Sequence, residues 1–145
     1  MKFNQLVLLF FCVGNIFSQT AIFTDKAPKP IGPYSQAILK GDRLYVSGQI
    51  AINPVTNLLD TASIESETVR VLENIKAILT EAKMDISNIV KTTIYLSDLK
   101  YFSKVNDIYQ KYFIDSNKPF PARETIQAAA LPRGVRIEIS VIAEK

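Results

Sequence analysis

The sequence predicts an α+β fold in which two helices cover one face of a mixed sheet. Strand-like and helix-like segments follow one another in the order strands, helix, strand, helix, two strands. Segments 63–83 and 101–113 repeat apolar residues at helical spacing, so each has an apolar stripe to bury. Both stripes need the apolar face of the sheet. The other sheet face is therefore left for solvent or for another subunit.

The first half of the domain is predicted to contain three strands before the long helix. Residues 20–29 read as a short strand that runs into a proline-rich loop. Strands 34–40 and 43–49 should form a hairpin, because Gly41-Asp42 is a favourable two-residue turn.

The long helix 63–83 follows a loop over residues 50–60, and Ser63 is its predicted N-cap. A strand over residues 90–96 comes next. The second helix, 101–113, is expected to bury four of its side chains: Phe102, Val105, Tyr109 and Tyr112.

The last two strands are predicted to form an antiparallel hairpin. Segments 120–125 and 135–140 alternate their side chains, and residues 131–134 between them have turn composition. If Ala130 pairs with Val135, one face of the hairpin is polar. That face would carry Arg123, Thr125, Gln127, Glu138 and Ser140. Diagonal neighbours lie roughly 7–8 Å apart, a gap in which a guanidinium and a carboxylate can hold a small acid and a water molecule.

The first 18 residues have the outline of a secretion signal. Lys2 gives the positive start, residues 6–13 the apolar core, and residues 16–18 a cleavage tripeptide that ends in a small residue. The alternative is a short buried helix or strand. We therefore expect a signal peptide at 1–18, a single domain at 19–145, a secreted or periplasmic location, and no membrane attachment after signal removal.

The composition removes much of the catalytic repertoire. The chain has no histidine, and its single cysteine, Cys12, lies within the predicted signal. A cysteine nucleophile, a Ser-His-Asp relay, a structural disulfide and a His/Cys zinc site are thus excluded from the mature domain. The net charge of +3 is too small to predict a nucleic-acid or membrane partner. Any chemistry must use Arg, Glu, Tyr, Ser, Thr, backbone groups and water.

The sequence resembles the reactive intermediate deaminase family (RidA/YjgF, also known as L-PSP endoribonuclease) from about residue 24 to residue 143. The resemblance rests on six motifs in order: IGPYSQA at 31–37, VSGQI at 46–50, VKTT at 90–93, VNDIY at 105–109, FPAR at 120–123 and IEI at 137–139. It implies a chorismate-mutase-like fold of the bacillus type, assembled as a homotrimer with sites in the clefts between subunits. It also implies cofactor-free hydrolysis of enamines and imines, such as 2-iminobutanoate and 2-iminopropanoate, to 2-oxo acids and ammonia.

The resemblance also assigns roles to residues. Arg123 would grip the substrate carboxylate by bidentate pairing, Glu138 would move protons, and Tyr34 would wall the pocket from a neighbouring subunit. The alternatives are an arginine that ties subunits together, a glutamate paired with Arg133 or Arg136, and a core tyrosine.

Four further positions are expected to bind the substrate beside Arg123: Ser47, Gly48, Asn106 and Thr125. Ser47 and Gly48 fall at a strand end, where small side chains let backbone groups approach a ligand or simply form a bulge. Thr125 stands where the family often has a cysteine. A main-chain contribution at that position survives the change, whereas a thiol role does not.

Two other functions compete with hydrolysis. The cleft can bind a small carboxylate without turning it over, or a trimer can act like a chaperone through exposed apolar surface. RNA cleavage is disfavoured, because no histidine is available for acid–base work and Lys100, Lys104 and Lys111 read as a solvated helix face. No nucleic-acid partner is expected.

Overall fold

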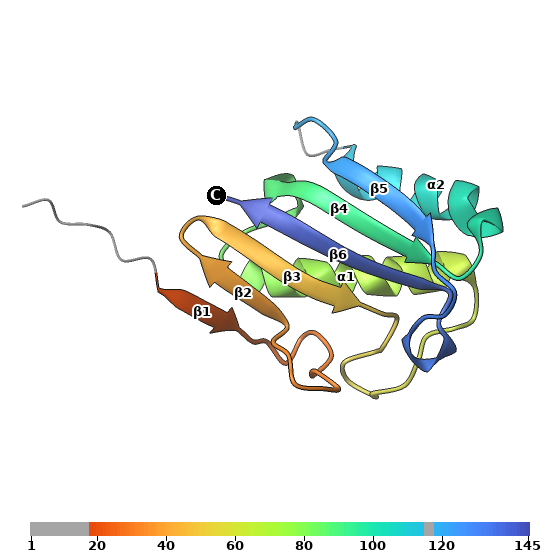
Figure 1. Cartoon of the computed structure of the whole chain (residues 1–145), viewed down its shortest axis with the longest axis horizontal. Helices are drawn as coiled ribbons and strands as arrows, with labels where there is room; N and C mark the ends of the chain where they lie inside the picture. The colour runs from red at the N-terminus through yellow and green to blue at the C-terminus, as the bar shows by residue number, and fades with distance from the viewer. Residues whose placement is uncertain (1–17, 115–117) are drawn as a thin grey trace, which may run out of the picture.

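The computed structural model describes residues 18–114 and 118–145, so the predicted signal peptide lies outside the described residues except for Ser18. Six strands form one sheet in the order β1-β2-β3-β6-β4-β5. Both helices lie behind this sheet in Figure 1, so the prediction of an α+β fold with two helices on one face is confirmed. The elements are β1 Gln19–Ile22, β2 Ala37–Lys40, β3 Arg43–Gln49, α1 Ile64–Glu81, β4 Ile89–Leu96, α2 Phe102–Phe113, β5 Ala122–Gln127 and β6 Ile137–Glu144, with single 3₁₀ turns at Ile86–Asn88, Leu99–Tyr101 and Pro132–Gly134.

The hairpin predicted at Gly41-Asp42 is present. Strands β2 and β3 pair antiparallel from Ala37↔Val46 to Lys40↔Arg43. Gly41 takes a φ of 59°, which a glycine adopts without steric cost. Strand β2 starts three residues later than predicted. The buried Gln36 side chain just before it instead bonds the backbone of the preceding loop.

Helix α1 begins as predicted, because Ser63 is its N-cap. The Ser63 Oγ accepts from the Ser66 amide at 3.1 Å, and the Ser66 Oγ accepts from the Ser63 amide at 3.0 Å. This reciprocal pair satisfies two backbone donors that the first helical turn leaves open. The apolar stripe of the helix is buried against the sheet: Val71, Leu72, Ile75, Ile78 and Leu79.

Helix α2 buries Val105, Tyr109 and Phe113, while Tyr112 is half-buried. The prediction for Phe102 is wrong, since its side chain is 44% exposed. Phe102 is the first residue of the helix, and its ring lies against the Arg123 guanidinium instead of entering the core.

The predicted terminal hairpin is wrong. Strand β4 lies between the last two strands: β5 pairs with it in parallel and β6 in antiparallel. The connecting segment crosses the end of β4, where the Ala128 amide donates to the Leu96 carbonyl at 2.8 Å and the Ser97 amide to the Arg136 carbonyl at 2.9 Å. A period-two pattern fits any neighbouring strand equally well, so the pattern alone does not specify the partner.

This strand order separates the two charged residues that were predicted to share a face. In β5, Arg123, Thr125 and Gln127 align with Thr92, Ile94 and Leu96, which are buried under the helices. In β6, Glu138 alternates with Ile137 and Ile139, which belong to the same core. Arg123 therefore lies on the helix side of the sheet and Glu138 on the open side.

Candidate functional site

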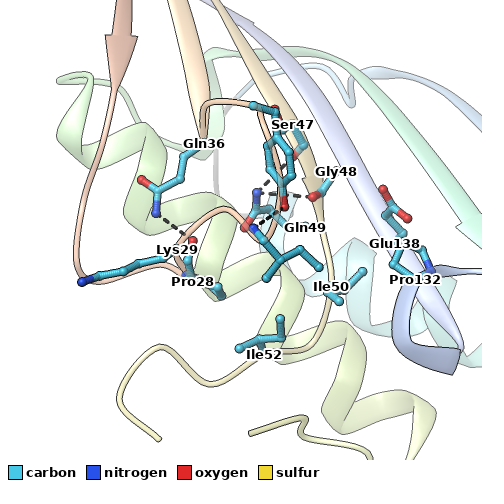
Figure 2. A pocket seen from close by; sticks show the side chains of 12 residues that line it. Pro28, Lys29, Gln36, Ser47, Gly48, Gln49, Ile50, Ile52, Pro132 and Glu138 are labelled. Carbon is cyan, nitrogen blue, oxygen red and sulfur yellow. Dashed lines mark hydrogen bonds between the residues drawn. The ribbon is translucent and has the colours of Figure 1, made fainter. Parts of the chain in front are cut away.

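A hollow of about 290 Å³ lies at the end of β3, beside Glu138. We call it the Glu138 hollow. Figure 2 shows the Glu138 side chain near Pro132 on one side of this hollow, with Gln36 and Lys29 on the other. Its walls come from the loop before β2, from the end of β3 with the loop after it, and from β6 with the turn before it. Its lining is Pro28, Lys29, Ile31, Tyr34, Gln36, Ser47, Gly48, Gln49, Ile50, Ile52, Pro132 and Glu138.

A bulge in β3 brings Gly48 against Glu138. The pairing of β3 with β6 shifts register between Val46 and Gln49, as the sequence pattern allowed at this strand end. A Cβ added at Gly48 would overlap the Glu138 Oε1 and lie 2.8 Å from its Cδ. Only glycine lets the carboxyl group occupy this place.

Among the described residues, no cation forms an ion pair with the Glu138 carboxyl. Arg136, one of its proposed partners, pairs with Glu67, and no ion pair within residues 18–114 and 118–145 joins Glu138 to Arg133. The side chain is half-buried, and this burial raises the pKa of Glu138 because it disfavours the charged form. A carboxyl group of this kind can accept and release a proton closer to neutrality than an exposed glutamate.

Tyr34 and Ser47 line the same hollow. The Tyr34 side chain is 47% exposed, so it is not a core tyrosine, and its Oη accepts from the Ile31 amide at 3.2 Å. The Ser47 Oγ donates to the Ser35 carbonyl at 2.7 Å. Tyr34 thus stands at the rim of the hollow, and Ser47 ties the preceding loop to β3.

Three isoleucines that line the hollow, Ile31, Ile50 and Ile52, were not among the predicted site residues. The buried Asn74 of α1 fixes the backbone of two of them by donating to the Ile50 and Ile52 carbonyls at 3.2 and 3.0 Å. In the sequence, only their position in or next to the motifs IGPYSQA and VSGQI could have identified them as site residues. Apolar side chains at such places are indistinguishable from core residues in the sequence.

Arg123 lines a separate hollow of about 410 Å³. We call it the Arg123 hollow. Helix α2 forms one wall of it, and the segment that leads into β5 forms another. Its lining is Asn106, Tyr109, Gln110, Phe120, Pro121 and Arg123.

In the described part of the chain, an amide oxygen and aromatic rings contact the Arg123 guanidinium. Its Nη2 donates to the Asn106 Oδ1 at 2.9 Å, and its Cζ lies 4.8 Å from the centre of the Tyr109 ring. None of the ion pairs among the described residues involves Arg123. A guanidinium in this state is a ready site for a planar anion such as a carboxylate.

The predicted site residues thus fall into two groups. One group surrounds the Glu138 hollow: Tyr34, Ser47, Gly48 and Glu138. The other includes Asn106 and Arg123 in the Arg123 hollow. Thr125 lies two residues farther along the same side of β5, outside the lining of that hollow. A single chain does not bring the two groups together.

Three further observations concern metal ions, membranes and nucleic acid. No group of three or more His, Cys, Asp or Glu residues with the potential to hold a metal ion occurs in the described part of the chain. No helix there has both the length and the apolar character needed to cross a membrane. Among the three lysines predicted to form a solvated helix face, Lys100 pairs with Asp98 at 2.8 Å and Lys104 with Glu65 at 2.9 Å. These pairs reduce the positive field that an RNA-binding surface needs.

Comparison with known proteins identifies the family. The family model described as Endoribonuclease L-PSP matches residues 24–145. The chain belongs to the RidA/YjgF family. The resemblance found in the sequence is thereby confirmed over nearly the whole predicted domain.

Among its RidA/YjgF relatives, a RutC family protein of Saccharolobus solfataricus is 55% identical over 86% of this chain and 96% of its own length. A 2-iminobutanoate/2-iminopropanoate deaminase of Bos taurus is 47% identical, with 84% of this chain and 87% of the relative covered. A crystal structure of a conserved Rid family protein of unknown function from Yersinia pestis superposes with a TM-score of 0.84. It is 48% identical over 88% of this chain and 100% of that structure.

Proposed function

We propose that this protein hydrolyses small 2-imino acids and their enamine tautomers, such as 2-iminobutanoate and 2-iminopropanoate, to 2-oxo acids and ammonia. The observation that carries the proposal is the half-buried carboxyl of Glu138, which lies over Gly48, forms no ion pair with any described residue and has a raised pKa. Family membership and the similarity to a bovine protein named as such a deaminase support it.

The proposal requires two copies of the chain. Arg123 and Glu138 lie on opposite sides of the sheet, so a complete site must combine the Arg123 hollow of one subunit with the Glu138 hollow of the next. A head-to-tail contact closes into a ring when the rotation between subunits is suitable, and we propose the homotrimer that the family resemblance implies. A monomer would lack the activity.

Within that site, each group has a defined task. The N–H groups of Arg123 that have no partner among the described residues bind the substrate carboxylate, while Asn106 holds one side of the guanidinium. Glu138 holds a water molecule and takes a proton from it as the oxygen attacks the imine carbon. The proton passes to the nitrogen, so that the C=N bond becomes the C–N bond of a carbinolamine. The hydroxyl proton of the carbinolamine then moves through Glu138 to the same nitrogen, the C–N bond breaks, and ammonia leaves as the C=O bond of the 2-oxo acid forms. Water is the only co-reactant, so no cofactor is needed.

The direct test is release of 2-oxobutanoate from the imine that an amino acid oxidase produces. The purified oligomer should accelerate this release, and Arg123→Ala and Glu138→Gln should each abolish the acceleration. A wild-type oligomer that binds 2-oxobutanoate without accelerating imine hydrolysis would instead favour the non-catalytic carboxylate-binding function.

Mixed oligomers test whether the site is shared. Arg123→Ala and Glu138→Gln chains, unfolded together and refolded, should recover about a quarter of the wild-type activity, because both intact groups meet at that fraction of head-to-tail interfaces. Refolding each variant alone is the control. Mixtures that stay inactive while wild type refolds to full activity would rule out a shared site.

We also propose that residues 1–18 direct export, as their sequence pattern indicates. Expression in the native cell followed by N-terminal sequencing should give a mature chain that starts at Gln19. A full-length chain recovered from the cytoplasmic fraction would reject this part of the proposal.

A further inference from the structure

Aromatic side chains lie beside the Arg123 guanidinium, and the proposed mechanism gives them no role. Two aromatic rings flank the guanidinium, with the Tyr109 ring centre 4.8 Å and the Phe102 ring centre 5.7 Å from its Cζ. Asn106 supplies a neutral oxygen, and no described carboxylate forms an ion pair with Arg123. The arginine is thus supported by π faces and an amide.

The Tyr109 ring is itself firmly placed. Its Oη donates to the Oγ1 of the buried Thr92 at 2.9 Å. On α2, its ring stacks on Phe113 with the centres 4.5 Å apart. The Tyr109 side chain is buried, its hydroxyl is hydrogen-bonded and its ring is stacked on Phe113. The ring is therefore held in place beside the guanidinium.

A π face supports a cation differently from a carboxylate. The aromatic ring attracts a guanidinium that lies above the ring plane, and it leaves the N–H groups in the plane of the guanidinium free. A protein carboxylate at the same place would occupy those groups and neutralise the charge, and so would compete with the substrate carboxylate. Aromatic support therefore orients the arginine while preserving its capacity to bind an anion.

We propose that Tyr109 is a positioning residue that presents Arg123 to the substrate carboxylate, with burial of the ring and its stacking on Phe113 holding the ring in place. The inference rests on the proposed function for the identity of that carboxylate as a 2-imino acid. The proposal predicts that loss of the Tyr109 ring weakens the binding of charged ligands, and that loss of the hydroxyl alone changes their affinity little.

Calorimetric titration of the assembled protein with 2-oxobutanoate and with neutral 2-oxobutanamide tests this proposal. Tyr109→Leu should weaken 2-oxobutanoate binding about 3- to 30-fold, as expected for loss of a cation–π contact, and should leave amide binding unchanged. Tyr109→Phe, which keeps the ring, should bind the acid within about twofold of wild type. In turnover, Tyr109→Leu should raise KM by the same factor with kcat unchanged, since the carboxylate is bound equally in ground and transition states.

Tyr112→Leu is the matched control. It removes a tyrosine from the same helix whose Oη donates to Glu73 instead of facing Arg123, so it should leave both affinities unchanged. Equal weakening of acid and amide by Tyr109→Leu, or equal weakening of acid binding by Tyr112→Leu, would overturn the proposal. If Tyr109→Leu does not fold, the exposed Phe102 carries the test, and Phe102→Leu should weaken acid binding selectively by a smaller factor.

Failure of this inference is distinguishable from failure of the proposed function. Wild-type protein that binds 2-oxobutanoate but does not hydrolyse the imine would reject the function, while the affinities of the Tyr109 variants would still decide the role of the ring. Wild-type protein without measurable preference for the acid over the amide would reject the role of Tyr109 directly.

Discussion

Glu67 and Glu138 are two glutamates withdrawn from water, and their surroundings are opposite. The Glu67 carboxylate is buried between α1 and the start of β6, where it accepts from the Arg136 amide at 2.9 Å and from the Arg136 Nε at 2.7 Å. Glu138 lies in β6, two residues after Arg136. Its carboxyl has neither a cation nor a hydrogen-bond donor among the described residues. Every partner that stabilises Glu67 is missing at Glu138.

The difference separates a structural carboxylate from a chemically available one. Glu67 joins the helix to the sheet, and Arg136 extends this link by donating from Nη2 to the Thr61 carbonyl at 2.7 Å. Both oxygens of this carboxylate are occupied by Arg136, so neither is open to a substrate. Burial without compensation, as at Glu138, costs stability and produces a carboxyl group poised for proton transfer.

The largest expected effect comes from Glu138→Gln, which keeps the shape of the side chain and removes its acid–base function. Turnover of the oxidase-generated imine should fall about 10²- to 10⁴-fold, the usual contribution of a general acid–base group. Resistance to urea should stay the same or rise, because an uncompensated carboxyl group is lost. Glu144→Gln on the exposed end of β6 is the control and should change neither quantity.

Glu67→Ala should show the reverse pattern. Removing one partner of a buried pair leaves Arg136 uncompensated, so the free energy of unfolding should drop by about 3 kcal/mol, with the remaining exposure of Arg136 limiting the loss. Urea denaturation measures this loss of unfolding free energy. Glu73→Ala, at an exposed site on the same helix, should cost less than about 1 kcal/mol. Equal costs at the two positions would remove the distinction between Glu67 and an ordinary helix glutamate.

Gly48→Ala probes the placement of the Glu138 carboxyl. The added Cβ must displace Oε1, and a shift of about 1 Å at a reacting group lowers the rate by about 10²-fold. The imine assay should show this loss in a folded protein. Gly134→Ala provides the contrast: its Cβ meets nothing within 4 Å, but its φ of 71° is strained for alanine. It should cost about 1 kcal/mol of stability and little activity.

The smallest expected effect is the change of folding stability with pH. It also tests whether the neighbouring subunit acts on Glu138. In Arg123→Ala, burial acts alone, so the pKa of Glu138 lies above the ordinary 4.5. Folding then favours the protonated form, and the stability contributed by Glu138 is complete below pH 4.5 and lost as the pH rises through the raised pKa. Urea midpoints of Arg123→Ala, compared with those of Arg123→Ala/Glu138→Gln, should show this fall only in the single variant.

A carbon-13 NMR titration of Glu138 links the pH effect to assembly. If the Arg123 of an adjoining subunit approaches Glu138, the pKa of Glu138 should be lower in the wild-type oligomer than in Arg123→Ala. An identical pKa in both proteins would contradict the shared site.

Local chemistry made several elements predictable from the chain. Ser63 caps α1 with its own hydroxyl, and Gly41 supplies the positive φ of the β2–β3 turn. These features depend on groups within a few residues of one another, so no distant contact can easily override them. The motifs that carry the family resemblance likewise lie in short continuous segments.

The predicted site residues lie in two separate hollows, and the single shared face predicted for them was wrong. Gly48 and Glu138 lie together, as do Asn106 and Arg123. The common polar face for Arg123 and Glu138 does not exist in one chain, because β4 inserts between β5 and β6. The aromatic support of Arg123 also escaped prediction, since Tyr109 and Phe102 read as core positions of an amphipathic helix.

The sequence by itself determined the helices, the first hairpin, the alternation of side chains along each strand and the absence of histidine from any mechanism. Only the tertiary structure decided which strands are neighbours, and hence which side of the sheet each alternating set faces. The physical reason is that a strand's period of two fixes which residues point the same way, whereas its hydrogen-bonding edges accept any extended partner. The choice is made by the whole core, through the burial of the apolar sides of β3, β4 and β6 against α1 and α2.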